Sequence, residues 1–187
     1  MKYKVFLLIF FASYYVAAYA QPKEVFNLME RFRYKEAIEL LQNMPKTTEN
    51  QLLKAECHQK LYNYADALRL YLHLSESNPD NLSIAIAAAE CASQAGDAET
   101  SLKYWIKANV LQPQNPFLET RKAMAFYRAE DWENTIKSAE TVFEKDSIPL
   151  LLRMTGDAYL NMNDVIMANY FFTKALDKNP SDHISLS

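Results

Sequence analysis

The sequence of 187 residues contains only two glycines, Gly96 and Gly156, and this scarcity excludes several kinds of site and fold. Loops that cradle phosphate need closely spaced glycines whose backbone can approach the ligand, and these two lie far apart in the sequence. Runs rich in alternating β-branched residues, which are typical of strands, are also scarce. Glycine costs about 1 kcal/mol in a helix interior, so a chain that is poor in glycine and rich in alanine and leucine favours helices. We therefore predict an all-α fold.

Patterns that carry chemistry are absent as well. The three histidines, His58, His73 and His183, are never three or four residues apart, the spacing that places two ligands on one helix face. We expect His58 to be a packed side chain rather than a ligand or a catalytic base. The many carboxylates fall at positions expected for solvated helix faces. The prediction is a protein without enzyme activity, with no cofactor and no metal site.

The first twenty residues differ in character from the rest. Lys2 and Lys4 form a basic start, residues 5–16 are mostly apolar and aromatic, and Ala18-Tyr19-Ala20 is a small-residue cleavage pattern. This layout predicts a secretory signal peptide cleaved after Ala20, and hence a periplasmic or secreted protein. An uncleaved anchor is the alternative, but residues 5–20 are shorter than the roughly 20 residues that span a bilayer.

Cleavage would leave 18 basic and 23 acidic residues, a formal net charge of −5. Nucleic acid selects for basic patches, so it is not an expected partner. No second long apolar run follows, so stable membrane insertion is not expected after cleavage either.

After the signal, one pattern returns at a near-constant interval. Pro79 and Pro113, which end helical patterns, are separated by about 34 residues, and Pro180 follows at close to twice that interval. Small residues in the middle of amphipathic stretches recur at nearly the same interval: Ala67, Ser101, Thr135 and Ala168. A fainter copy places Ala37 thirty residues before Ala67. Self-similarity at this period is the signature of a solenoid.

The residues at these places resemble the tetratricopeptide repeat (TPR), a pair of antiparallel helices with small residues where the helices cross. On this register the first helices carry their small residues at Ala55, Ala89, Ala123 and Gly156. Aromatic residues open several second helices or lie further along them: Tyr34, Tyr64, Trp132, Tyr71, Trp105 and Phe172. The resemblance covers roughly residues 24–182 and implies a right-handed superhelical solenoid of antiparallel helix pairs.

Cys57 and Cys91 occupy the same position in two successive copies of the repeat. In an oxidising compartment, two cysteines point to a disulfide. Packed helices lie about 8–10 Å apart, however, whereas a disulfide needs Cα atoms within about 4.4–6.8 Å. We expect two buried free thiols, with the disulfide as the alternative.

The predicted organisation is a signal peptide at 1–20 and a TPR solenoid at 21–187. The solenoid comprises a partial N-terminal repeat and four full repeats, at 24–45 and at about 48–81, 82–115, 116–148 and 149–182. Residues 181–187 look like the start of a further first helix. A bare terminal repeat exposes the face that its neighbour would cover. We therefore expect that the natural chain continues beyond Ser187, or that a partner or a second copy covers this end.

The resemblance implies that the first helices line a concave groove for a protein partner. The early groove positions include Glu49, Glu56, Glu90 and Ser93, and the three glutamates make this half acidic, whereas the later positions are aromatic, apolar and basic. Aromatic and arginine side chains dominate binding energy at interfaces, so the candidate site is the later half. It consists of Phe117, Thr120, Arg121, Met124, Tyr127, Arg128, Leu150, Arg153, Asp157 and Leu160.

Of the residues with which one TPR subset grips the C-terminal carboxylate of cytosolic chaperones, only Arg121 is matched, so that activity is not expected. The predicted function is a periplasmic or secreted scaffold or adaptor that binds a peptide or protein in the groove. The first alternative is a structural subunit of a cell-envelope assembly, with self-association through the uncapped C-terminal repeat. The second is a docking arm of a longer protein with a C-terminal functional domain.

Overall fold

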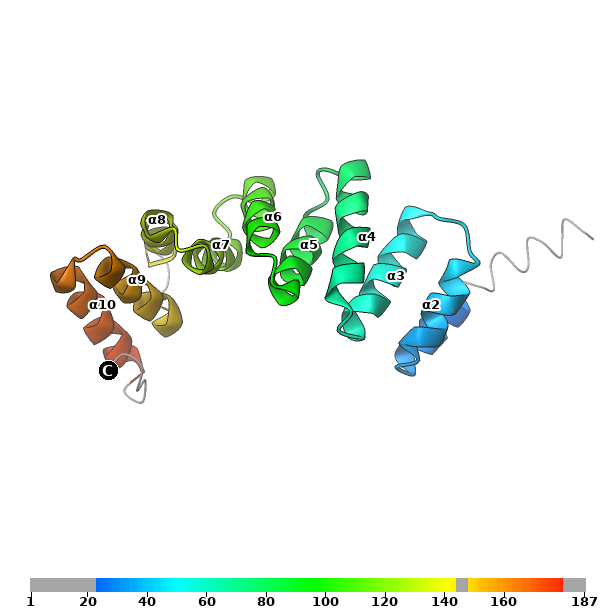
Figure 1. Ribbon diagram of the computed structural model, residues 1–187, viewed down its shortest axis with the longest axis horizontal. Helices are drawn as coiled ribbons and strands as arrows, with labels where there is room; N and C mark the ends of the chain where they lie inside the picture. Colours follow the sequence, from blue (N-terminus) through cyan, green and yellow to red (C-terminus); the bar gives the residue numbers. More distant parts are fainter. Residues whose placement is uncertain (1–22, 144–147, 180–187) are drawn as a thin grey trace, which may run out of the picture. The chain divides into compact units, whose positions relative to one another are not determined.

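A computed structural model describes residues 23–143 and 148–179, and within these ranges every regular element is a helix (Figure 1). The all-α class predicted from the sequence is therefore confirmed for the described part of the chain. The predicted signal peptide at 1–20 and the segment after Asn179, which includes Pro180, lie outside the described residues.

Residues 23–30 are helical, and nine further helices are described after them. They are α2 (Tyr34–Gln42), α3 (Thr48–Lys60), α4 (Tyr64–Ser77), α5 (Leu82–Ala95), α6 (Ala98–Leu111), α7 (Pro116–Arg128), α8 (Trp132–Phe143), α9 (Pro149–Asn161) and α10 (Val165–Lys178). The chain divides between Ser77 and Asn78 into two compact units. The repeat boundaries drawn from the sequence stay predictions.

The first unit packs α3 against both α2 and α4. Its core gathers apolar side chains from residues 23–30, α2 and α3, and Met44 from the turn between those two helices. The buried members are Val25, Leu28, Ala37, Ile38, Leu41, Met44, Leu53 and Cys57.

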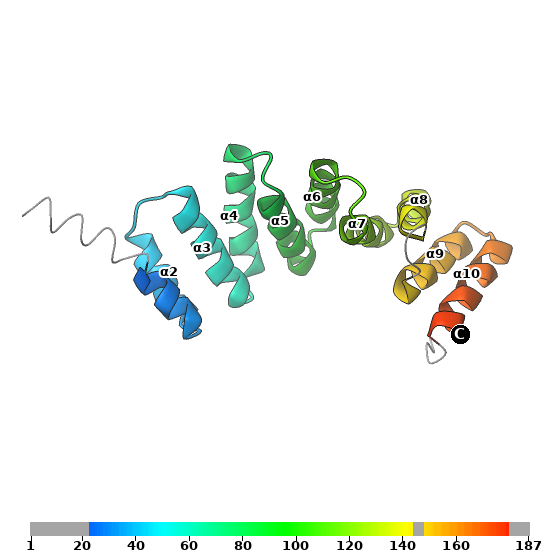
Figure 2. The ribbon, with the colours of Figure 1, turned by 180° about the vertical axis from the view of Figure 1, so that it is seen from behind.

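In its described residues the second unit contains three helix pairs, α5–α6, α7–α8 and α9–α10 (Figures 1 and 2). Each helix contacts the next along the chain, and α7 also contacts α9 across the intervening α8. Because the connections within a pair are short, the two helices of a pair run antiparallel. The first helices, α5, α7 and α9, are the first members of these three pairs.

Small side chains allow the paired helices to approach closely. All the predicted small positions are buried: Ala55, Ala89, Ala123 and Gly156 in first helices, and Ala67, Ser101, Thr135 and Ala168 in second helices. At the α5–α6 crossing the Ser101 hydroxyl donates a hydrogen bond of 3.0 Å to the Ala89 carbonyl oxygen. A larger side chain there would separate the backbones, and overpacking typically costs about 1–3 kcal/mol.

The turn within each pair uses one left-handed residue, and these residues share a register: Phe32, Tyr62, Gly96, Glu130 and Asn163. The backbone amide of the following residue donates a hydrogen bond to a carbonyl near the end of the first helix. That of Asp97, for example, donates to the Ala92 carbonyl at 2.9 Å. The Asp97 carboxylate in turn accepts a 3.0 Å hydrogen bond from the Thr100 amide and caps α6. Gly96, with φ +82°, is the turn residue that the sequence predicts.

Cys57 and Cys91 are both fully buried and free, as the sequence predicts. Burial raises the pKa of each thiol to about 11, with a smaller contribution from the neighbouring Glu56 or Glu90 carboxylate. Buried thiols of this kind pack as small apolar residues and are poor nucleophiles.

Candidate partner-binding face

The predicted site residues lie on α7 and α9, two of the three first helices of the second unit. We use the name first-helix face for the side chains at the predicted groove positions of α5, α7 and α9. It comprises Glu90 and Ser93 of α5 together with the predicted site residues of α7 and α9. Three apolar members of this face are exposed, Phe117 at 48%, Leu150 at 43% and Leu160 at 48%. The apolar part of the predicted site is thus open to solvent rather than absorbed into the core.

Tyr127, Asp157 and Arg153 form one hydrogen-bonded cluster. The Tyr127 hydroxyl donates to Asp157 Oδ2 at 3.0 Å, and Arg153 Nη1 lies 3.3 Å from the same oxygen. Arg153 and Asp157 are one turn apart on α9, whereas Tyr127 reaches them from α7. Burial, followed by the hydrogen bond to Asp157 and its charge, raises the pKa of Tyr127. The cluster therefore joins α7 to α9 and holds three polar side chains in fixed positions.

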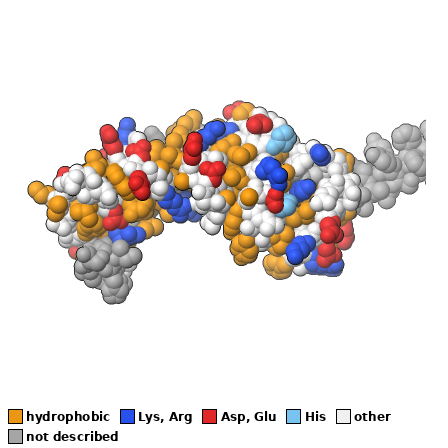
Figure 3. All heavy atoms as spheres, viewed as in Figure 1, with side chains coloured by type: hydrophobic (Ala, Val, Ile, Leu, Met, Phe, Trp, Pro, Cys, Tyr) orange, Lys and Arg blue, Asp and Glu red, His pale blue; other side chains and the backbone are white. Residues whose placement is uncertain are grey.

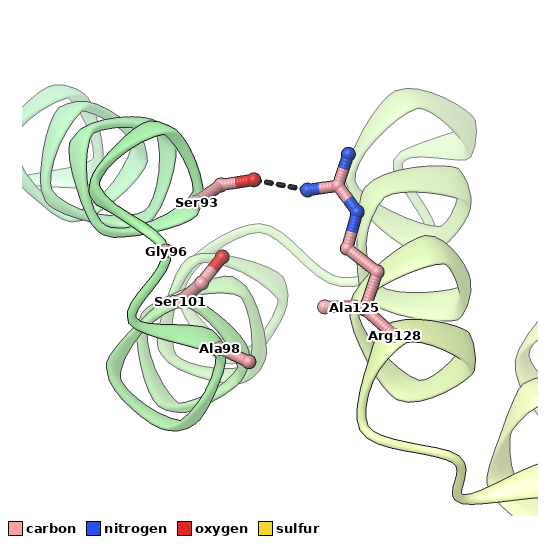
Figure 4. A pocket seen from close by; sticks show the side chains of 6 residues that line it. All are labelled: Ser93, Gly96, Ala98, Ser101, Ala125 and Arg128. Carbon is pink, nitrogen blue, oxygen red and sulfur yellow. Dashed lines mark hydrogen bonds between the residues drawn. The ribbon is translucent and has the colours of Figure 1, made fainter.

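A second polar contact joins α7 to α5. The Arg128 guanidinium donates a hydrogen bond to the Ser93 hydroxyl, which belongs to the preceding first helix (Figure 4). Ser93 and Arg128 both occupy predicted groove positions. Together with the Tyr127–Asp157 bond, this contact places all three first helices in one laterally connected face.

At the start of α7, Phe117 and Arg121 form a further cluster with Trp105 of α6. The Phe117 and Trp105 rings meet edge to face, with centroids 6.2 Å apart. The Arg121 guanidinium lies 5.2 Å from the Phe117 ring centre and 5.8 Å from that of Trp105. Arginine stacked on rings in this way is held by cation–π attraction.

The two remaining predicted residues contribute less. Thr120 donates its hydroxyl to the Pro116 carbonyl at 2.7 Å, a bond within its own helix. Met124 is half-buried between the two clusters on α7. The structure thus brings Tyr127, Arg153 and Asp157 together and joins Phe117 to Arg121, while Leu150 and Leu160 add exposed apolar surface.

The sequence reasoning missed a small pocket beside this face. It has a volume of about 190 Å³ and is lined by Ser93, Gly96, Ala98, Ser101, Ala125 and Arg128 (Figure 4). The signal that could have revealed it is Ala98, which opens a second helix where Tyr34, Tyr64 and Trp132 open others.

His58 is half-buried, its Nδ1 atom lies 4.0 Å from Asp66 Oδ2, and burial lowers its pKa. Within residues 23–143 and 148–179, no three histidine, cysteine or carboxylate side chains are grouped so that they could hold a metal ion. None of the helices in those ranges has the length and apolar character needed to cross a bilayer.

No protein-family model and no curated protein matches this sequence. Solved structures do match it. MamA AMB-1 is 18% identical, with a TM-score of 0.75 over 91% of this chain and 97% of that one. MamA from Desulfovibrio magneticus RS-1 is 14% identical, with a TM-score of 0.73 over 88% and 97%.

YrrB, a TPR protein with an unusual peptide-binding site, is 12% identical, with a TM-score of 0.77 over 87% of this chain and 86% of its own. At such low identities the likeness establishes the fold. The chain has the TPR solenoid fold, and the resemblance seen in the sequence is confirmed at that level.

Proposed function

We propose that this protein is an interaction scaffold that holds a segment of another protein on its first-helix face. The observation that carries the proposal is the combination on α7 and α9 of exposed apolar side chains with fixed arginine and tyrosine side chains. Residues of these types dominate the energy of protein interfaces. YrrB, which shares the fold, has a peptide-binding site, and this supports a peptide or protein as the partner class.

The arrangement of the first-helix face suits binding of a partner. The Tyr127–Asp157 and Arg128–Ser93 bonds fix the spacing of α5, α7 and α9 before a partner arrives. A preorganised face loses less side-chain freedom on binding, and this reduces the cost of association. Leu150 and Leu160, exposed on α9, would supply apolar area that is removed from water in the complex.

The first test uses residues whose replacement leaves both polar clusters intact. Leu150→Glu/Leu160→Glu places two charges on exposed positions, so the free protein should keep its melting temperature. Capture of partners from the native host should fall at least about tenfold, because burying an unpaired carboxylate at an interface is costly. The matched control is Val110→Glu in α6, where Val110 is 72% exposed and lies off the face. Equal capture by the double variant and the wild type would refute the proposal.

We propose further that the scaffold acts in the periplasm or after secretion. Support comes from the basic start, the apolar run and the Ala18-Tyr19-Ala20 pattern of residues 1–20. N-terminal sequencing of the protein from its host should find Gln21 first. A protein recovered from the cytoplasm with Met1 or Lys2 at its start would contradict this localisation.

A second candidate function, a structural subunit of a cell-envelope assembly, is favoured by the surface of α10. Figure 3 shows hydrophobic side chains at the surface over α9 and α10. Ile166 is 82% exposed and Tyr170 48%, and one repeat earlier the matching residues are Glu133 and Lys137. Exposed apolar patches of this kind mark interaction sites.

This candidate predicts self-association through the C-terminal repeat. Light scattering should then show a mass that rises with protein concentration, and Ile166→Glu should return the protein to a monomer. A monomeric mass at all concentrations would show that the C-terminal repeat does not self-associate. That result would exclude this candidate.

A further inference from the structure

The pocket beside the first-helix face opens where α5, α6 and α7 meet (Figure 4). Among its lining residues Ala125 and Ser101 are buried, whereas Ala98 is exposed and lies at its edge. Its rim carries Ser93 and Arg128, which belong to the first-helix face. Ser101 donates its hydroxyl to the Ala89 carbonyl. The polar groups that can face an occupant are therefore mainly Ser93 and Arg128, beside the small side chains of Ala98 and Ala125.

The pocket lies at a second-helix start that lacks an aromatic residue. Tyr34, Tyr64 and Trp132 are the first residues of α2, α4 and α8, and all three are half-buried. The Trp132 ring packs edge to face on Tyr127, with centroids 5.6 Å apart. The first residue of α6 is Ala98, which is exposed and points toward α7 in Figure 4. A methyl group thus stands where three related positions carry a ring, while the first residue of α10, Val165, is aliphatic too.

The volume of about 190 Å³ limits what can enter. Small-molecule sites usually measure about 300–1,000 Å³, so this pocket suits one side chain rather than a whole metabolite. An apolar cavity of about 150 Å³ is large enough to hold benzene, so a single ring fits here.

We propose that this pocket receives an aromatic side chain from the partner segment, which replaces the ring that Ala98 lacks. The inference rests on the proposed function, since Ser93 and Arg128 place the pocket mouth on the first-helix face. The Arg128 guanidinium at the rim can lie against the ring, as Arg121 already lies against Phe117 and Trp105. An aliphatic side chain would fill the pocket but would gain nothing from the guanidinium.

The test uses p-cresol, the side chain of tyrosine, as a free probe, so it needs no identified partner. In the full chain with labelled alanine methyl groups, p-cresol should shift the Ala98 and Ala125 signals in a saturable way. Its saturated analogue methylcyclohexanol should bind at least about fivefold more weakly, because it lacks the ring face.

Ala98→Trp should fill the pocket and reduce p-cresol binding at least about tenfold, while the melting temperature stays at or above that of the wild type. Trp132 already occupies the same helix position, so the fold accommodates this side chain. The matched control, Val110→Trp, places an equal ring on an exposed position of α6 and should leave p-cresol binding unchanged.

The inference is overturned if p-cresol shifts neither methyl signal, if it binds Ala98→Trp as well as wild type, or if methylcyclohexanol binds equally well. None of these results bears on capture by the Leu150→Glu/Leu160→Glu variant. If instead p-cresol binds at Ala98 while that variant captures partners normally, the proposed function fails and the assignment of the ring to a partner segment on this face fails with it.

Discussion

Gly156 in α9 lies directly against the ring of Phe172 in α10. A Cβ atom added to this glycine would come within 2.6 Å of both Cδ1 and Cε1 of that ring. Carbon atoms do not approach so closely, so the ring and the methyl group cannot share the space. The glycine is therefore what lets the last helix pair close around its aromatic residue.

Gly156→Ala should destabilise the protein although alanine is the better helix former. Overpacking costs about 1–3 kcal/mol, and removing a helical glycine returns about 1 kcal/mol. The expected net loss, measured by urea unfolding, is about 1 kcal/mol.

The control is the same substitution in a Phe172→Ala background. With the ring removed, only the helix propensity remains, so Gly156→Ala should stabilise that background by roughly 0.5–1 kcal/mol. The same sign in both backgrounds would show that the ring does not determine the choice of glycine.

Trp105→Ala should cost about 3–5 kcal/mol, because the indole is 4% exposed and fills the space between α6 and α7. Trp132→Ala is the matched control. Trp132 is only half-buried, so its loss should cost clearly less. A cost below about 1 kcal/mol for Trp105→Ala would mean that this side chain is not part of the core.

Ionisation of the Tyr127 hydroxyl should lower the free energy of unfolding at alkaline pH. Its pKa is raised in the folded protein, so its contribution is fully present below the ordinary tyrosine pKa of about 10 and is lost as the pH rises through the raised value. The wild type should therefore lose stability above about pH 10 faster than Tyr127→Phe does.

Comparing the two proteins removes the contribution of Tyr159, whose pKa burial also raises. At neutral pH, Tyr127→Phe should cost about 0.5–1.5 kcal/mol for the lost hydrogen bond to Asp157. Parallel pH profiles for the two proteins would contradict the assignment.

Cys57 and Cys91 should resist thiol reagents in the folded protein. A pKa raised from 9.0 to about 11 lowers the thiolate fraction near neutral pH about 100-fold, and burial blocks access as well. Ellman's reagent should react with both thiols only after unfolding. Rapid reaction of the native protein, or an intact mass that increases by two hydrogen atoms on reduction, would contradict two buried free thiols.

The fold could be predicted from the sequence because its determinants repeat. Small residues at crossings, such as Ala89 and Ser101, recur once in every repeat, and one copy of the pattern supports the next. The candidate face was harder to predict. Register places Tyr127 and Asp157 on successive first helices, but which side chain bonds to which depends on rotamers that no periodicity encodes. Ser93 was assigned to the groove, yet its bond to Arg128 emerges only from the packing of α5 against its neighbours.

Ala98, in contrast to the bonds of the candidate face, is a feature that the sequence itself displays. It interrupts a pattern set by Tyr64 and Trp132, and that interruption was readable from the sequence. The sequence does not show whether the space left by the missing ring stays open or collapses. Only the packing of α6 against α7 shows that a pocket remains.

Photo-crosslinking in the native host tests the central claim most directly, because Leu160 on the first-helix face and Tyr170 on α10 are equally exposed, at 48% each. A photoreactive residue is placed at one position or the other in the full chain. If the first-helix face holds the partner, position 160 should form a discrete adduct with another protein, and position 170 should not. Adducts from position 170 alone would contradict the account.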